Sequence, residues 1–336
     1  MSLQPVEIPL GAMRFNSDSQ KLEYFNGDIW MQVHTFNPDL NGGTRGLFAS
    51  GAVAPTGYAN VIDYITISTA GNAVDFGDTT DTQYEGGATS SNTRGVIALG
   101  YSNPATVDVI DYVTMSSTGD AIDFGNLVSA KRCTCAFSNG TRGIWAGGYP
   151  HQNTMDYITI ASTGNAADFG DAVWAGNYGT ANVASPTRGI KAGGRQTGPV
   201  AVKNNIDYIT TATLGNAQDF GDCTSVVMFA AGISNSTRGV WGGGSAPGNT
   251  SLIQKIEIAT LGNAQEFGDL TAARSSPGGA SSPTRGCVAG GRTPTLQNTI
   301  DYFAIPTGGN AVDFGDFSSG ARANTAGFSN GHGGLG

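Results

Sequence analysis

The sequence predicts an all-β protein built from repeated four-stranded sheets, and three observations support this fold class. The phrase GNAADFGD at residues 164–171 recurs with small changes at five other places, and the arginines of a second phrase, Thr-Arg-Gly, lie 46 to 50 residues apart. Between these phrases, short β-branched and aromatic runs are separated by turn residues. No stretch repeats apolar residues at helical spacing for three turns. Self-similarity at such a period indicates a repeated structural unit.

The third unit illustrates the strands expected in each repeat. Four strands are predicted at 132–138, 143–147, 155–160 and 166–170. A four-stranded sheet of this size cannot bury two apolar faces alone, so neighbouring sheets must stack. The composition agrees, because 51 Gly, 39% apolar and only 13% charged residues in 336 are typical of many short strands joined by tight turns.

The repeated phrase is interpreted as structural. Six copies exclude the magnesium-binding DFG signature of kinases, since an active site needs one such Asp beside different partners. Gly164 and Asn165 suit a turn between the third and fourth strands, and Asp168 and Asp171 are expected to accept hydrogen bonds from backbone groups of the next turn. The aromatic residue of each copy is expected to pack between sheets: Phe76, Phe124, Phe169, Phe220, Phe267 and Phe314.

A calcium site on the paired carboxylates is the alternative reading of this phrase. Asp120, Asn126 and Glu266 replace the usual residues in two of the copies. A strict oxygen cage would resist such changes, so the structural reading is favoured. The Thr-Arg-Gly arginines are likewise expected to bridge neighbouring sheets through carbonyl or Asp partners: Arg45, Arg94, Arg142, Arg188, Arg238 and Arg285.

The unit resembles the kelch repeat. The matching features are glycine pairs after the second strand, namely Gly147-Gly148, Gly193-Gly194, Gly243-Gly244 and Gly290-Gly291, with a Phe where kelch has a fourth-strand Trp. The resemblance covers residues 44–330 and implies a six-bladed β-propeller. Residues 321–331 match 130–140 and have no further strands after them. They are predicted to supply the missing first strand of blade one and so close the ring.

Variation between the repeats predicts where binding occurs. The connections between strands one and two, and between three and four, barely change, whereas those between two and three and between four and one differ in length and character. Variable loops on a uniform scaffold are where binding usually resides. Five aromatic residues in these loops are candidate ligand-binding residues, and ordinary loop packing is the alternative for each: Tyr84, Tyr101, Tyr149, Trp174 and Tyr178.

Residues 1–32 do not repeat and predict a small module of short strands, with the propeller over 33–336. A sheet of this size is marginal alone, and Phe15, Leu22, Tyr24 and Trp30 are expected to form an exposed apolar face for attachment or self-association, with a trimer favoured. The module resembles a β-hairpin module of bacteriophage virion proteins, and ten residues carry the match: Gly11, Arg14, Phe15, Asn16, Leu22, Glu23, Tyr24, Asn26, Gly27 and Trp30.

Charge and composition exclude several classes of protein. With 26 acidic and 17 basic residues the net charge is −9, and the absence of a basic stripe argues against nucleic acid as a partner. No signal peptide is recognised, no apolar run reaches the ~20 residues of a membrane helix, and the four cysteines show no framework spacing. A soluble protein made in a reducing cytosol, without metal or cofactor, is expected.

These resemblances imply a bacteriophage structural protein, made in the host cytoplasm and located in the virion as a tail-associated, fibre-like or decoration protein. Residues 1–32 would contact other virion proteins, and the propeller would bind a host surface glycan or protein. A kelch-fold enzyme, either a carbohydrate oxidase or a glycosidase, is the alternative. The only histidines are His34, His151 and His332, and Glu85 has no paired carboxylate nearby in the sequence, so no enzymatic activity is expected. An intracellular kelch adaptor would need a helical partner domain, which the sequence lacks.

Overall fold

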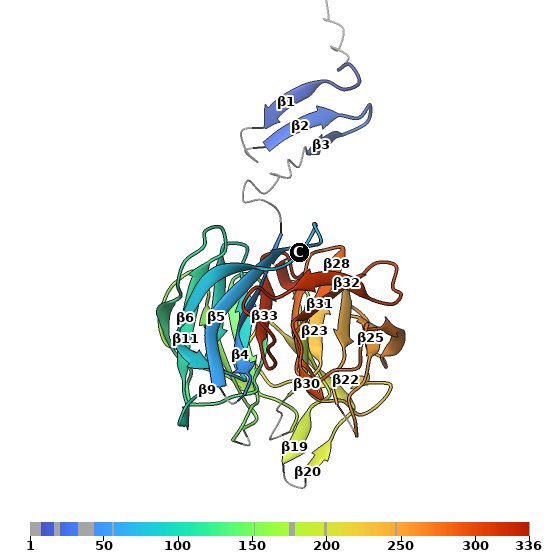
Figure 1. Ribbon diagram of the computed structural model, residues 1–336. Coiled ribbons are helices and arrows are strands. Elements are labelled where there is room, and N and C mark those ends of the chain that lie inside the picture. The colour runs from blue at the N-terminus through green and yellow to red at the C-terminus, as the bar shows by residue number, and fades with distance from the viewer. Residues whose placement is uncertain are drawn as a thin grey trace, which may run out of the picture. The chain divides into compact units, whose positions relative to one another are not determined.

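The computed structural model describes residues 8–16, 21–32, 44–55, 57–150, 152–174, 179–197, 200–245 and 247–335. The chain divides into two compact units, Met1–Gly42 and Gly43–Gly336. The described part is all-β, with one 3-10 turn, η1 (Gly333–Leu335), and no α-helix (Figure 1). No helix in it is long and apolar enough to cross a membrane. The predicted boundary after residue 32 borders residues 33–43, which lie outside the described residues.

The first unit is a three-stranded antiparallel sheet of β1 (Met13–Asn16), β2 (Lys21–Phe25) and β3 (Trp30–Gln32), in that order. Between β2 and β3, the side-chain oxygen of Asn26 accepts hydrogen bonds from the backbone N–H groups of Asp28 and Ile29. This turn chemistry is typical of Asn, whose side chain mimics a backbone carbonyl.

The described residues of the second unit form six four-stranded antiparallel sheets, here called I to VI. The strand that comes first in each order below is its first strand. Sheet I is β33 (Ala326–Ser329), β4 (Arg45–Val53), β5 (Gly57–Thr66) and β6 (Val74–Gln83); sheet II is β7 (Gly87–Ser90), β8 (Arg94–Ala98), β11 (Val109–Thr114) and β12 (Ile122–Asn126); sheet III is β13 (Cys135–Ser138), β14 (Arg142–Ala146), β15 (Thr154–Thr159) and β16 (Ala167–Asp171).

Sheets IV to VI repeat the same order. Sheet IV is β17 (Ala181–Ala184), β18 (Arg188–Ala192), β21 (Asn205–Thr210) and β22 (Gln218–Asp222); sheet V is β23 (Ala231–Ser234), β24 (Arg238–Gly242), β25 (Leu252–Glu257) and β26 (Gln265–Asp269); sheet VI is β27 (Gly278–Ser281), β28 (Arg285–Ala289), β31 (Thr299–Ala304) and β32 (Val312–Asp316). Three hairpins extend the loops between second and third strands: β9 (Tyr101–Ser102) with β10 (Ala105–Thr106), β19 (Arg195–Thr197) with β20 (Val200–Val202), and β29 (Arg292–Thr293) with β30 (Thr295–Leu296).

The strand from the far end of the sequence completes sheet I. Ala326 of β33 pairs with Ala49 of β4, and Ser329 pairs with Gly46 (Figure 1). Asn330 fastens the start of β4, because its side-chain oxygen accepts the N–H of Arg45 at 2.8 Å. The prediction that residues 321–331 supply the missing first strand of this sheet is confirmed. The chain therefore enters the second unit at Thr44 and Arg45, beside the last residues of β33.

Apolar side chains are buried between successive sheets in six clusters. The cluster between sheets VI and I, for example, joins Cys287 and Phe314 of sheet VI to Phe48 and Ile65 of sheet I. The fourth-strand Phe of every repeat takes part in one of these clusters, as the sequence predicts. Packing between sheets therefore buries the faces that a single sheet would leave exposed.

The repeated GNAxDFGD phrase ties each sheet to the one before it. The N–H of Gly215 in the phrase of sheet IV donates to the carbonyl of Phe169 in sheet III at 2.9 Å, and the N–H of Asp171 donates to the side-chain oxygen of Asn216 at 3.0 Å. Gly170 has φ +140°, and a Cβ there would lie 2.5 Å from the carbonyl oxygen of Gly215. Only glycine permits this approach of two backbones.

This contact differs from the expected one. The carboxylates of the phrase are not the acceptors; the acceptors are the Asn side chain and the carbonyls of the preceding fourth strand. The arrangement also explains Asp120 in the second copy, because its carboxylate takes the place of the Asn oxygen and accepts the N–H of Asp78 at 3.0 Å. Asn72 of sheet I makes the same contact with Asp316 of sheet VI.

Most of the buried carboxylates on the third strands pair with a cation, whereas Asp111 of sheet II accepts hydrogen bonds from the N–H and hydroxyl of Thr80. On the third strands, Asp156 pairs with Lys131 at 3.0 Å, Asp301 pairs with Arg274, and Asp63 pairs with Arg322 at 2.6 Å. In sheet V the carboxylate is replaced by Gln254, and the cation four residues before the first strand is replaced by Val227. Acid and base are absent together there, as expected where an unpaired buried charge is costly.

Removing residues 321–336 should destabilise the second unit severely, because it deletes β33 and exposes the edge of β4. We expect aggregation, or a fall in Tm of more than about 10 °C, measured by circular dichroism. A chain lacking residues 1–32 is the control and should melt like the full chain. Equal melting of the 321–336 deletion and the full chain would contradict the role given to β33.

Arg322→Ala should cost about 3–5 kcal/mol in the free energy of unfolding, because it leaves the fully buried Asp63 carboxylate without its cation. Urea denaturation measures this loss. Arg292→Ala is the matched control, since Arg292 is exposed in β29 and its loss should change stability by no more than about 0.5 kcal/mol. Similar losses of unfolding free energy in the two variants would show that the buried ion pair contributes no more to stability than an exposed arginine.

Candidate functional site

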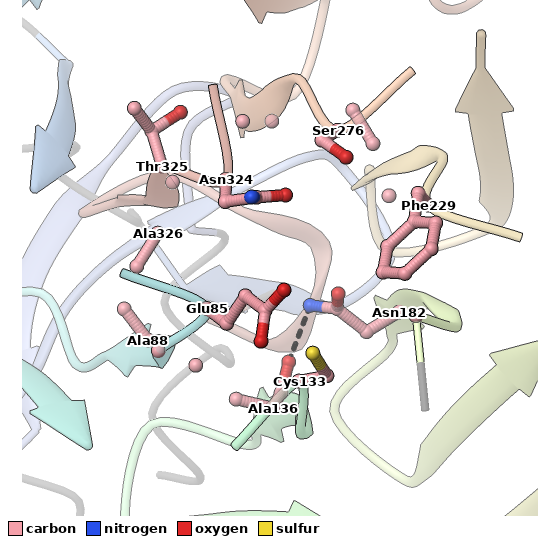
Figure 2. A pocket seen from close by; sticks show the side chains of 18 of the residues that line it. Glu85, Ala88, Cys133, Ala136, Asn182, Phe229, Ser276, Asn324, Thr325 and Ala326 are labelled. Atoms are coloured by element: carbon pink, nitrogen blue, oxygen red, sulfur yellow. Dashed lines mark hydrogen bonds between the residues drawn. The ribbon is translucent and has the colours of Figure 1, made fainter. Parts of the chain in front are cut away.

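A cavity of about 100 Å³ opens where the first strands of the six sheets begin, and residues of all six sheets line it (Figure 2). This end of the sheets lies beside the loops between second and third strands. In sheet III, Cys135 at the start of the first strand pairs with Ala146 at the end of the second, and Arg132 bridges to Tyr149 in the loop that follows. The variable connections and the cavity mouth therefore share one end of the unit. We call this the loop end.

Six equivalent residues at the cavity mouth share one unusual backbone conformation. Each lies two residues before the first strand of its sheet and has φ between 54° and 69°. Left-handed conformations are disfavoured for residues other than glycine, at a cost of about 1–3 kcal/mol each. The side chain nevertheless differs at every one of these positions: Glu85, Cys133, Gly179, Phe229, Ser276 and Asn324.

Hydrogen bonds explain why this backbone conformation recurs. The N–H of Cys133 donates to the carbonyl of Glu85 at 2.6 Å, and the N–H of Gly179 donates to the carbonyl of Cys133 at 3.3 Å. The series continues through Phe229, Ser276 and Asn324 at 2.5 to 2.8 Å. The left-handed turn directs the N–H of five of these six residues to the preceding sheet, so the scaffold fixes the backbone and leaves the side chain unconstrained.

One side chain forms the floor of the cavity. The second residue of each first strand lines it, and five of these six residues are small: Ala88, Ala136, Gly232, Gly279 and Gly327. The sixth is Asn182, whose Nδ2 donates to the carbonyl of Ala136 at 2.5 Å. Glycine is required beside it, because a Cβ at Gly232 would lie 1.9 Å from the carbonyl oxygen of Asn182. Asn182 therefore narrows the space between the first strands.

The opposite end of the first strands is closed by residues 332–335. His332 is partly buried, and its Nε2 lies 3.1 Å from the hydroxyl of Ser138 and 3.1 Å from the carbonyl of Ser90. Burial lowers the pKa of His332 to about 4, despite the opposing effect of the Ser90 carbonyl. The ring is neutral at pH 7, and a smaller cavity of about 40 Å³ separates it from the floor residues. The mouth at the loop end is thus the open side.

An aromatic cluster adjoins the mouth. Tyr58 stacks on Tyr84 with ring centroids 4.5 Å apart, and the Tyr101 ring lies edge-on to both. The Arg132 guanidinium lies 5.0 Å from the Tyr101 ring and 4.9 Å from the Tyr149 ring, and donates to the Tyr84 hydroxyl at 3.1 Å. Burial, with the nearby carboxylate of Glu85, raises the pKa of Tyr84 to about 12.

Three of the five aromatic residues singled out from the sequence thus lie together, namely Tyr84, Tyr101 and Tyr149. Trp174 belongs to a different contact, in which the Lys191 ammonium lies 4.6 Å from its ring. Tyr178 lies outside the described residues. Sequence reasoning missed Tyr58, Arg132 and the six mouth residues. The six mouth residues could have been recognised from the alignment of the repeats. Each lies two residues before a first strand, at a position where the residue type changes in every repeat.

The six Thr-Arg-Gly arginines lie at the end opposite the cavity mouth. Arg142 donates to the carbonyl of Thr211 in sheet IV at 2.9 Å and stacks on Tyr157 of its own sheet at 4.6 Å. Each of the others donates to a carbonyl of the following sheet: Arg45 to Met115, Arg94 to Ile160, Arg188 to Ile258, Arg238 to Ile305 and Arg285 to Ile67.

The first unit presents a second candidate surface. Strand pairing places five apolar side chains on one face of its sheet, exposed by 39% to 67%: Met13, Phe15, Leu22, Tyr24 and Met31. Trp30 departs from the predicted face. It pairs with Phe25 and therefore lies on the other side, where its ring is 5.5 Å from Phe25 and 4.2 Å from the Arg14 guanidinium.

The thiol at the mouth is a poor nucleophile. Burial, followed by the nearby Glu85, raises the pKa of the Cys133 thiol well above its usual range, so the thiolate that a nucleophile requires is scarce. Among the described residues, no three His, Cys, Asp or Glu side chains are grouped so that they could hold a metal ion. Hydroxyl, amide and aromatic groups remain as the available contacts.

The native protein should react slowly with iodoacetamide at pH 8, because burial raises the pKa of all four thiols and each unit lowers the thiolate fraction about tenfold. Mass spectrometry of labelled peptides measures the rates, with the urea-unfolded chain at the same pH as the control. Cys133 is the decisive residue because it is partly exposed. Fast stoichiometric labelling of Cys133 in the native state would contradict its description as an unreactive thiol.

No protein-family model matches the chain, and no curated protein matches it at a significant level. Its function is therefore inferred from the geometry of the cavity mouth and of the first unit.

Proposed function

We propose that this chain is a bacteriophage virion structural protein, tail-associated, fibre-like or decorating the particle. Its second unit is a closed, kelch-like, six-bladed propeller that binds a glycan or protein of the host surface. The observation that carries the binding role is the cavity mouth, where one backbone conformation recurs six times with six different side chains. A scaffold that fixes backbone geometry and frees residue type is suited to recognition.

Contacts between sheets VI and I support ring closure. Arg285 of sheet VI donates to the carbonyl of Ile67 at 2.9 Å, and the N–H of Gly71 donates to the carbonyl of Phe314 at 2.8 Å. Equivalent pairs join each sheet to the next throughout the second unit. If the last sheet contacts the first as every other sheet contacts its neighbour, the arrangement is a ring with no first or last blade.

The exposed face of the first unit supports the attachment role. Five apolar side chains on so small a sheet form a patch of the kind that marks an interaction site. In the proposal, this face joins copies of the chain, with a trimer favoured, and holds them to other virion proteins. The resemblance of residues 11–30 to a module of phage virion proteins supports the same setting.

A double variant, Phe15→Ser with Leu22→Ser, should abolish self-association and incorporation into particles, because it removes one cross-strand pair of apolar side chains from the exposed face. Light scattering reports the oligomer, and mass spectrometry of particles assembled from the encoding genome reports incorporation. Leu214→Ser with Leu261→Ser is the matched control, since these leucines are 56% and 57% exposed on turns of the second unit. Absence of the unaltered chain from the particles would refute the virion assignment.

A further inference from the structure

We propose that the cavity mouth takes a single uncharged sugar residue, at the end of a neutral glycan. This inference rests on the proposed binding function and names its ligand class. It is carried by the size of the cavity, by the Asn182 amide oxygen in its wall, by its charge and by the aromatic ring on one side.

The volume selects a small ligand. A bound water needs about 10–15 Å³ of cavity volume. The cavity of about 100 Å³ therefore has room for a ligand the size of several water molecules. Pockets for drug-sized ligands are several times larger, at about 300–1,000 Å³. One sugar ring entering from the open mouth matches the space, and the rest of a glycan chain would extend over the loop end.

One polar group in the wall is placed to meet a ligand. Asn182 is partly buried and uses its Nδ2 on the carbonyl of Ala136, which leaves its Oδ1 for a ligand. A sugar hydroxyl can donate a hydrogen bond to this amide oxygen.

Charge argues for a neutral sugar. Among the described residues that line the cavity, Glu85 is the one with a charged side chain, and its carboxylate lies 3.5 Å from the Arg132 guanidinium. An anionic sugar would meet this carboxylate and would find no cation that is not already paired. A cationic sugar would compete with Arg132 for it. A neutral sugar leaves the Glu85–Arg132 ion pair intact. Its hydroxyl groups can still donate hydrogen bonds to the polar groups of the wall or accept them.

The aromatic ring of Phe229 supplies the apolar side of the site. Figure 2 shows this ring and the Glu85 carboxylate on opposite sides of the cavity, with Asn182 between them in the view. A sugar ring has apolar C–H faces and polar edges. The apolar C–H face of a sugar can pack on the aromatic ring at one side of the cavity. Its polar edge can then meet the amide, hydroxyl and carboxylate groups at the other side.

Calorimetry with the full chain tests this inference. The probes are methyl glycosides of glucose, galactose, mannose and N-acetylglucosamine, with methyl glucuronide and N-acetylneuraminic acid as anionic members and methyl glucosaminide as a cationic one. We expect saturable binding of at least one neutral probe. Phe229→Gly and Asn182→Gly should each weaken it about tenfold or more, which corresponds to about 1.4 kcal/mol.

These variants are chosen so that folding is retained. Gly179 occupies the position of Phe229 in sheet IV, and Gly232 occupies the position of Asn182 in sheet V, so glycine already fits both backbones. Val226→Gly is the matched control, because Val226 is exposed three residues before Phe229 and does not line the cavity. Its affinity for the probe should equal that of the unaltered chain.

Three results would overturn the inference: no neutral probe binds at tens of millimolar, a charged probe binds more tightly, or the two cavity variants bind as the control does. The proposed function is scored separately, by the presence of the chain in particles and by binding of the fluorescently labelled chain to cells that those particles infect. If those succeed while the sugar test fails, only the ligand class is wrong. If the chain is absent from particles, the virion role falls whatever the sugar result.

Discussion

The close approach of each Gly-Asn turn to the fourth strand of the preceding sheet is the contact on which the rest of the second unit depends. Gly170 and Gly215 illustrate it, since two backbones meet there at a separation that no side chain permits. This contact sets the spacing of the sheets at the fourth-strand side, and the Phe clusters fill the space that it leaves between them. The Gly-Asn contact and the Phe clusters together fix the positions of the sheets. The first strands can then approach one another only as closely as their small residues allow, and the space left between them is the cavity.

The mouth residues show how a repeated scaffold accommodates chemical variety. Their left-handed backbone is disfavoured in Glu85, Cys133, Phe229, Ser276 and Asn324, and it is held by hydrogen bonds to the neighbouring sheet. Because these bonds use only backbone atoms, residue type can change without loss of the connection. The buried Asp–cation pairs are made by side chains and depend on residue type. Both partners are replaced in sheet V, by Gln254 and Val227, whereas in sheet II Asp111 remains with Gln83 at the position of the cation and binds Thr80 instead.

The sequence was sufficient to predict the four strands of each repeat and the added strand β33, because these follow from periodicity and from what an isolated sheet must bury. It also predicted that the arginines bridge neighbouring sheets, but left carbonyl and Asp partners open. It was not sufficient for the cavity mouth. Glu, Cys, Phe and Ser do not signal a left-handed backbone, which is imposed here by contacts between repeats. Trp30 was placed on the wrong face, because the register of a three-residue strand is set by its turn. Asp168 and Asp171 were given the hydrogen-bonding role that belongs to Asn and to main-chain carbonyls.

The point where the chain enters the second unit has a mechanical consequence. Thr44 leads into β4 at the end opposite the mouth, and β4 runs from there to the loop end, hydrogen-bonded on both sides to β33 and β5. In the proposed function, a pull between a ligand at the mouth and the chain before Thr44 would be directed along these strands, while their ladder hydrogen bonds lie across it. The bonds are loaded together in shear and do not open one after another, as they would if a strand were peeled from the edge. Sheet I, which the chain enters at Thr44, is thus suited to resist such a pull.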